Sequence, residues 1–150
     1  MNYFESMDNL NRLRQVLDEW IGTPFRHACG VKGRGTDCIH FVLRIMEETG
    51  AVPPGAIKVK PYAKDWHLHN SQELLVEGIR TSRRCTELPC NQSLYRDGDI
   101  ILFRFGRVSS HAAIYCNGSV YNSINGIGVV RLHFKDSSIL EIPTHLFRVN

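Results

Sequence analysis

Cys38 is the best candidate for a nucleophile. It lies at the predicted start of a helix, directly after Gly35-Thr36-Asp37. The unpaired N–H groups and the dipole of a helix start favour a thiolate, which is the reactive form of cysteine. A thiolate in this setting is typical of an enzyme that forms a covalent intermediate. The alternative is a small buried residue without chemistry, because free cysteine packs well in protein cores.

His111 is the best candidate for the base that such a nucleophile needs, and Asn122 for the residue that orients the base. Asn117-Gly118 predicts a two-residue hairpin turn between strands at 111–116 and 119–124. The opposed pairs then run from 116/119 through 113/122 to 111/124, which places His111 and Asn122 on one face. They are diagonal neighbours at roughly 7–8 Å between backbones, within reach of a side-chain hydrogen bond. The alternatives are a structural strand histidine and an edge asparagine.

Helices precede strands along the chain, and this order predicts an α+β domain. Apolar residues at three- and four-residue steps predict a helix over 8–21, capped by Asp8 and ended by Gly22. A second helix is predicted from Cys38 to Thr49, capped by Thr36 or Asp37 and stopped by Gly50, and a third over 71–79. The predicted strands are 100–103, 111–116, 119–124, 129–132 and 146–149. Helices packed on an antiparallel sheet position the three candidate residues.

Length and composition fit one globular domain over residues 1–150. The chain has 150 residues, of which 43% are hydrophobic and 22% charged, which argues against disorder. Its apolar runs are too short for a membrane span, and a net charge of +3 does not indicate a nucleic-acid partner. The first residues lack the pattern of a secretory signal, and the cysteines number five. We therefore expect synthesis in the bacterial cytoplasm without a signal peptide, with reduced thiols.

Two segments carry a resemblance to a known family. The first is WIGTPFR at residues 20–26 followed by GRGTDCIHFV at 33–42, and the second is GDIILF at 98–103 followed by SHAAIY at 110–115. Together they resemble the two motifs of the NlpC/P60 cysteine peptidases, in the right order and over roughly residues 20–45 and 97–130. The segment YAKDWHLH at 62–69 is similar to the phage-associated branch of that family.

The resemblance implies a papain-like NlpC/P60 fold and a thiol peptidase that cleaves amide bonds in the stem peptides of peptidoglycan. By the same resemblance Cys38 is the nucleophile, His111 the base and Asn122 the third polar residue. It implies no cofactor, and the expected partners are the stem peptide and, by the phage branch, tail proteins. A wall enzyme without a signal could reach the wall in a virion tail.

The substrate cleft is where the sequence departs from the family pattern. Phe25 stands where the family commonly has tyrosine, and Ile39-His40 where it usually has Ser-Gly. We expect substrate contacts from Phe25, Asp37, His40, Trp66 and His67. Asp37 is most simply a helix cap, His40 is either structural or substrate-facing, and Tyr62 and Trp66 are expected in part in the core, each with an exposed edge.

His67 and His69, with Cys85 and Cys90, raise the question of a metal site. The spacing of the two cysteines is loose, and histidines at alternate positions of an extended segment point apart. We therefore expect no metal, and interpret His67 as a loop residue near the cleft.

Two other functions stay open. The same fold and triad could serve a deamidase, an acyltransferase or an effector that acts on a different amide. A non-enzymatic tail component of a virion is the alternative from a different class, and an unreactive Cys38 would favour it.

Overall fold

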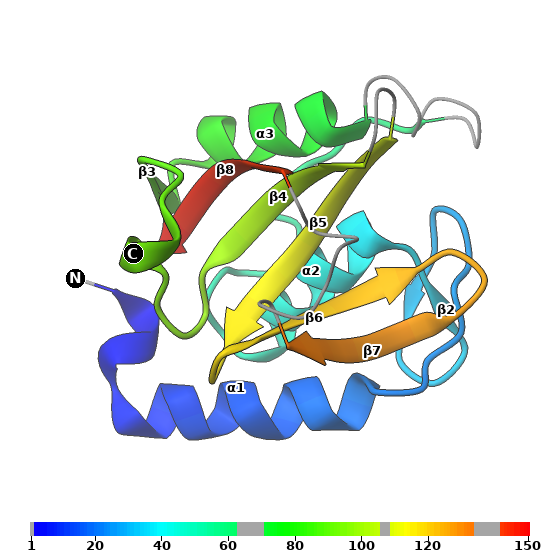
Figure 1. The fold of residues 1–150 in the computed structure, drawn as a ribbon, viewed down its shortest axis with the longest axis horizontal. Helices are drawn as coiled ribbons and strands as arrows, with labels where there is room; N and C mark the ends of the chain where they lie inside the picture. Colours follow the sequence, from blue (N-terminus) through cyan, green and yellow to red (C-terminus); the bar gives the residue numbers. More distant parts are fainter. Residues whose placement is uncertain (1, 63–70, 106–108, 134–141) are drawn as a thin grey trace.

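The structure, a computed structural model, describes residues 2–62, 71–105, 109–133 and 142–150 (Figure 1). Within these ranges the helices are α1 (Met7–Trp20), α2 (Cys38–Glu48) and α3 (Ser71–Ser82), with short 3-10 turns at Tyr3–Glu5 and Gln92–Leu94. A small hairpin pairs β1 (Gly30–Val31) with β2 (Gly35–Thr36). The remaining strands are β3 (Cys85–Leu88), β4 (Ile100–Phe105), β5 (Ser109–Cys116), β6 (Ser119–Ile124), β7 (Gly128–His133) and β8 (Ile142–Val149).

These six strands form one antiparallel sheet in the order β3-β8-β4-β5-β6-β7. The helices and one face of the sheet enclose the large hydrophobic core, which draws on residues from Phe4 to Val149. A smaller apolar cluster is built from Ile101, Phe103, Ala113, Val120 and Leu146.

The predicted α+β class is confirmed. The prediction of a single domain over 1–150 stays a prediction. No helix in the described ranges is long and apolar enough to cross a bilayer.

Helix α1 begins one residue before its predicted start, and its cap differs from the prediction. Ser6 is the N-cap and accepts a hydrogen bond from the backbone N–H of Asn9, whereas Asp8 lies inside the first turn. An acidic residue there complements the positive end of the helix dipole without acting as the cap. Ile21, expected on the buried face, is 43% exposed because it is already the C-cap.

Helix α2 begins at Cys38, as predicted, and is the central helix of the core. Asp37 is the N-cap, which resolves the alternative between Thr36 and Asp37. Its apolar residues pack inward because they recur on a broad face of the helix, and six are buried: Ile39, Phe41, Val42, Leu43, Ile45 and Met46. The helix ends at Glu48, and Gly50 turns the chain in the left-handed region at φ 81°.

The hairpin between β5 and β6 has the predicted turn. Asn117 and Gly118 both have positive φ, at 52° and 75°, and the pairs 116/119, 115/120 and 114/121 form. The further predicted pairs, 113/122 to 111/124, are wrong: the ladder between β5 and β6 ends at 114/121. Beyond that point β5 continues to pair with β4, and β6 with β7. The two strands therefore diverge from the hairpin outward (Figure 1).

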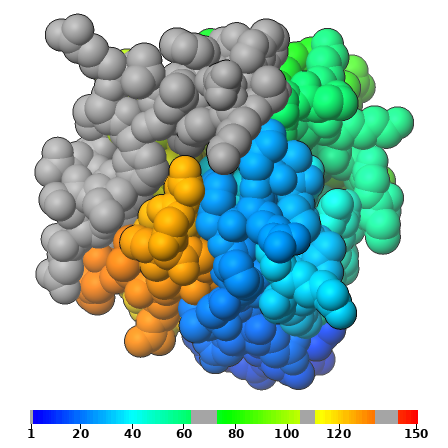
Figure 2. All heavy atoms as spheres, turned by 90° about the vertical axis from the view of Figure 1, so that its right-hand side faces the viewer, coloured from blue at the N-terminus to red at the C-terminus, as the bar shows by residue number. Residues whose placement is uncertain are grey.

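The N-terminal side of α2 packs against both diverging strands. The hydroxyl of Ser123 on β6 donates to the carbonyl of Thr36 at 2.7 Å, and both groups are buried. Backbone hydrogen bonds of 3.0 and 2.8 Å join Gly22 and Thr23 to Val129 of β7. Figure 2 shows this junction, where the segment before α2 (blue) lies beside the β6–β7 hairpin (orange). Because β5 and β6 separate, the start of α2 packs against the middle of the sheet.

Strand β3 is the strand of the six-stranded sheet that the sequence analysis missed. It pairs with β8 at the edge of the sheet, and its burial pattern has exposed residues in the middle rather than an alternation. Without alternation, a short edge strand gives no period-two signal. The third helix runs to Ser82 instead of Ile79 and ends where Arg83 adopts φ 57°.

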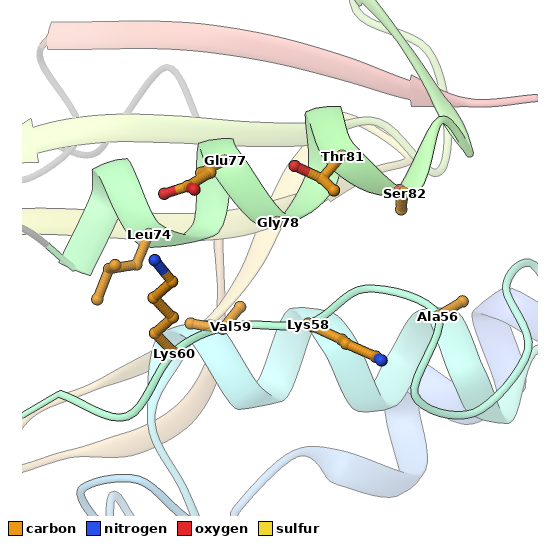
Figure 3. A pocket seen from close by; sticks show the side chains of 9 residues that line it. All are labelled: Ala56, Lys58, Val59, Lys60, Leu74, Glu77, Gly78, Thr81 and Ser82. Atoms are coloured by element: carbon orange, nitrogen blue, oxygen red, sulfur yellow. The ribbon is translucent and has the colours of Figure 1, made fainter.

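Helix α3 packs closely on residues 56–60, which lead from α2 toward Tyr62. A Cβ added to Gly78 would lie 2.3 Å from the carbonyl oxygen of Lys58, so only glycine permits this approach. Beside the contact lies a groove of about 500 Å³, shown in Figure 3. Its lining residues are Ala56, Lys58, Val59, Lys60, Leu74, Glu77, Gly78, Thr81 and Ser82. None of the candidate catalytic residues lines this groove.

The replacement Gly78→Ala tests this contact. The added methyl group must displace the backbone of Lys58, so we expect the free energy of unfolding to fall by about 1–3 kcal/mol. This outcome opposes the gain of about 1 kcal/mol that alanine normally brings to a helix interior. Urea denaturation measures the difference, with Thr81→Ala on the same helix as the control. A variant more stable than the original protein would contradict the packing.

Candidate active site

Cys38 is positioned by the first turn of α2 and by strand β5. The residue is partly exposed, so a reagent can reach it. The backbone N–H groups of Ala112 on β5, of Cys38 and of Ile39 lie near the Cys38 sulfur and favour its ionised form. Since Ala112 follows His111 directly in the chain, Cys38 lies close to the part of β5 that carries the base candidate.

His111 and Asn122 form the side-chain contact that the hairpin predicts. Nε2 of His111 lies 2.5 Å from Oδ1 of Asn122, and both residues are buried. The amide nitrogen of Asn122 donates to the carbonyls of Val120 and Val130, at 3.4 and 3.3 Å, so its oxygen is the atom turned to the histidine. An amide oxygen only accepts hydrogen bonds. Nε2 of His111 therefore carries the hydrogen, and Nδ1 carries the lone pair of a base.

The thiol and the imidazole are both neutral in the unliganded protein. Burial, and then the negative charge of Asp37, raise the pKa of Cys38 to about 12, although the surrounding N–H groups oppose this. Burial lowers the pKa of His111 to about 4, against the hydrogen bond to Asn122. The expected resting thiolate is thus not favoured here, because desolvation and Asp37 outweigh the helix start. A proton must pass from Cys38 to His111 before attack.

Asp37 is surrounded by donors of its own chain. Its Oδ1 accepts from the backbone N–H of His40 at 2.8 Å and from Nδ1 of His40 at 2.9 Å. Its Oδ2 accepts from the N–H of Ala28 at 2.8 Å and from the hydroxyl of Tyr62. Burial alone would raise the pKa of Asp37, but the hydrogen bonds from His40 and Tyr62 lower it. The carboxylate is therefore ionised.

The expected substrate-contact residues are only partly brought together. Asp37 and His40 adjoin the nucleophile, with the His40 side chain 21% exposed. Phe25 is half-buried and forms an isolated bridge with Thr36. Trp66 and His67 lie outside the described residues. The substrate roles of all five residues stay predictions.

Tyr62 is the site residue whose role the sequence analysis missed. It was expected as partial core, yet its hydroxyl reaches the carboxylate beside the nucleophile. Its ring lies edge-on to that of His27 at 5.2 Å between centroids. No periodicity or motif spacing links residue 62 to residue 37. Within the described ranges, no group of three histidine, cysteine or acidic side chains could hold a metal ion.

The rate of Cys38 alkylation by iodoacetamide tests the neutral pair. With a thiol pKa of about 12, the thiolate fraction rises through the whole neutral range. We expect the rate to rise close to tenfold per pH unit from about pH 6 to about pH 9. Peptide mass spectrometry separates Cys38 from the exposed Cys90. A rate that is flat over this range would instead reveal a preformed thiolate–imidazolium pair.

Comparisons with known proteins bear on the fold. No model of a known protein family matches the chain. No curated protein matches it either. Among solved structures, the chain is similar to NlpC2 from Trichomonas vaginalis, with 13% identity and a TM-score of 0.61 over 92% of this chain and 46% of that one. It is also similar to an NLP/P60 family protein from Staphylococcus aureus, described as similar to lipoprotein, with 14% identity and a TM-score of 0.61 over 96% and 42%.

The chain spans less than half the length of either solved protein. At these identities the likeness concerns the fold. It agrees with the fold that the two sequence motifs implied, and it leaves the phage-associated branch a prediction. The part of the chain that the structure describes has the fold of the NlpC/P60 proteins.

Proposed function

We propose that this protein is a thiol hydrolase that cleaves amide bonds in peptidoglycan stem peptides. The observation that carries the proposal is the hydrogen bond from Nε2 of His111 to Asn122, made beside a helix that starts with Cys38. A general base needs a partner that fixes its tautomer, and the amide oxygen of Asn122 supplies one. The NlpC/P60 fold and the two sequence motifs support the choice of substrate.

The first half of the reaction forms a thioester. The thiol proton of Cys38 passes to Nδ1 of His111 as the sulfur attacks the amide carbonyl, so that a C–S bond forms and the carbonyl electrons move to oxygen. The backbone N–H of Cys38, at the helix start, stabilises this oxyanion. The imidazolium of His111 then gives its proton to the leaving nitrogen, and the C–N bond breaks.

The second half restores the enzyme. His111 takes a proton from water as the water oxygen attacks the thioester carbonyl. The C–S bond breaks, the proton returns to the sulfur of Cys38, and the product leaves as a carboxylic acid. Asn122 holds the imidazole ring through both halves, because Nε2 keeps its hydrogen throughout.

The delivery route belongs to the proposal as well. Association with virion tail proteins and action at the wall are predictions that follow from the sequence resemblance. A hydrolase that acts on a different amide, such as a deamidase, would follow the same steps. It would differ only in the nitrogen group that leaves.

Digestion of purified muropeptides, followed by mass spectrometry, tests the proposal. We expect new fragments with the original protein, and a loss of cleavage of at least about 10³-fold with Cys38→Ala, because the covalent route disappears. Cys90→Ala is the matched control, since Cys90 is exposed and lies outside the site. This control should cleave at the original rate.

Three outcomes would contradict the proposal. Cleavage that survives in Cys38→Ala would exclude Cys38 as the nucleophile. No cleavage by the original protein, although Cys38 is alkylated faster than the other cysteines, would move the substrate to a different amide. No cleavage together with an inert Cys38 would favour the non-enzymatic tail component.

A further inference from the structure

Three segments far apart in the sequence converge on the carboxylate of Asp37. The N–H of Ala28 comes from the loop before β1, His40 from the first turn of α2, and the hydroxyl of Tyr62 from the segment that follows α2. The hydroxyl of Tyr62 also lies 3.1 Å from Nδ1 of His40. Capping the helix requires one donor from the backbone. The remaining donors go beyond what a cap needs.

The position of this carboxylate creates an electrostatic difficulty for the nucleophile. Asp37 is the residue before Cys38, and its negative charge disfavours a thiolate next to it. Hydrogen bonds donated to both carboxylate oxygens partly compensate that charge and reduce its effect on the sulfur. Tyr62 remains protonated and able to donate, because burial and then the charges of Asp37 and Cys38 raise its pKa.

The segment that carries Tyr62 is held in place from both sides. Ile57 is buried, and the carbonyl of Lys58 packs against Gly78 of α3, above the groove in Figure 3. His27 donates from Nε2 to the carbonyl of Tyr62 at 3.1 Å. The tyrosine hydroxyl is therefore fixed by packing that involves none of the three candidate catalytic residues.

We propose that Tyr62 and His40 are positioning residues that set the reactivity of Cys38 by holding and compensating the charge of Asp37. Tyr62 compensates through a neutral hydrogen bond at every pH at which the phenol is protonated. His40 compensates through the hydrogen bonds that its ring Nδ1 and its backbone N–H donate to Oδ1 of the carboxylate. The inference rests on the proposed function only in that Cys38 is the nucleophile.

The charged and titratable neighbours of this cluster come from each element packed around it. His40 faces Asp37 and Tyr62, and the side chain of Arg44 lies one turn further along α2, against the same glycine as His40. Tyr62 faces His27 from the preceding loop. From β5, His111 is uncharged at neutral pH because burial lowers its pKa to about 4. Asp37 is thus the anion that the donors compensate.

The variant Tyr62→Phe removes the hydroxyl alone. We expect iodoacetamide to alkylate Cys38 about 3–10-fold more slowly at a fixed pH, with the whole pH profile moved to higher pH by the corresponding half to one unit. Tyr3→Phe is the matched control, because the hydroxyl of Tyr3 donates at 2.9 Å to the carbonyl of Thr49 at the opposite end of α2. It should leave the profile in place. Thermal unfolding of both variants measures any loss of stability separately.

The variant His40→Ala removes the ring donor, whereas His40→Asn keeps a side-chain donor near the position of Nδ1. We expect iodoacetamide to alkylate Cys38 more slowly in His40→Ala than in the original protein, and His40→Asn to recover most of the lost rate. A structural role of the ring alone would slow both variants alike.

Equal profiles for Tyr62→Phe and Tyr3→Phe would overturn the proposal, as would equal alkylation rates for His40→Ala and His40→Asn. The readout needs no substrate. If the original protein cleaves no muropeptide but Tyr62→Phe still moves the profile, the proposed function fails and this inference holds. If cleavage depends on Cys38 but the profiles of Tyr62→Phe and Tyr3→Phe coincide, the proposed function holds and this inference fails.

Discussion

The buried carboxylate of Asp37 is the interaction on which the site depends. A charge with 4% exposure is costly unless donors surround it, and here the donors are supplied by three segments of the chain. The same group caps α2, so it fixes where the helix begins and therefore where Cys38 lies. Burial, and then the charge of Asp37, make the thiol beside it hard to ionise. One side chain thus fixes where the proposed nucleophile lies and contributes to its protonation state.

The divergence of β5 and β6 is the second constraint. A complete hairpin ladder would leave no place for the start of a helix between its strands. Because pairing ends at 114/121, the N–H of Ala112 is directed to Cys38 and the hydroxyl of Ser123 to Thr36. The hairpin still brings His111 and Asn122 together, and the amide of Asn122 spans to Val130 on β7. The sheet therefore serves as a rigid support for the base, while the helix brings the nucleophile to it.

Local signals in the sequence were sufficient for much of this arrangement. The turn at Asn117-Gly118, the cap at Asp37 and the start of α2 depend on a few neighbouring residues, and each was predicted. The contact of His111 with Asn122 followed from counting along the hairpin. The count was wrong for the outer pairs because the insertion of α2 is a tertiary effect that strand patterns do not contain. The role of Tyr62 and the neutral state of Cys38 were missed for the same reason: both depend on burial and on contacts between distant segments.

The central claim is that His111 presents a neutral ring with its hydrogen on Nε2, held by Asn122, and the lone pair of Nδ1 available for the thiol proton. Nitrogen-15 NMR of the histidine ring in the intact protein tests it most directly. The account predicts that, at neutral pH, Nε2 of His111 gives the shift of a protonated nitrogen and Nδ1 that of an unprotonated one, and that this pattern changes in Asn122→Ala. A hydrogen on Nδ1, or an imidazolium at neutral pH, would contradict it.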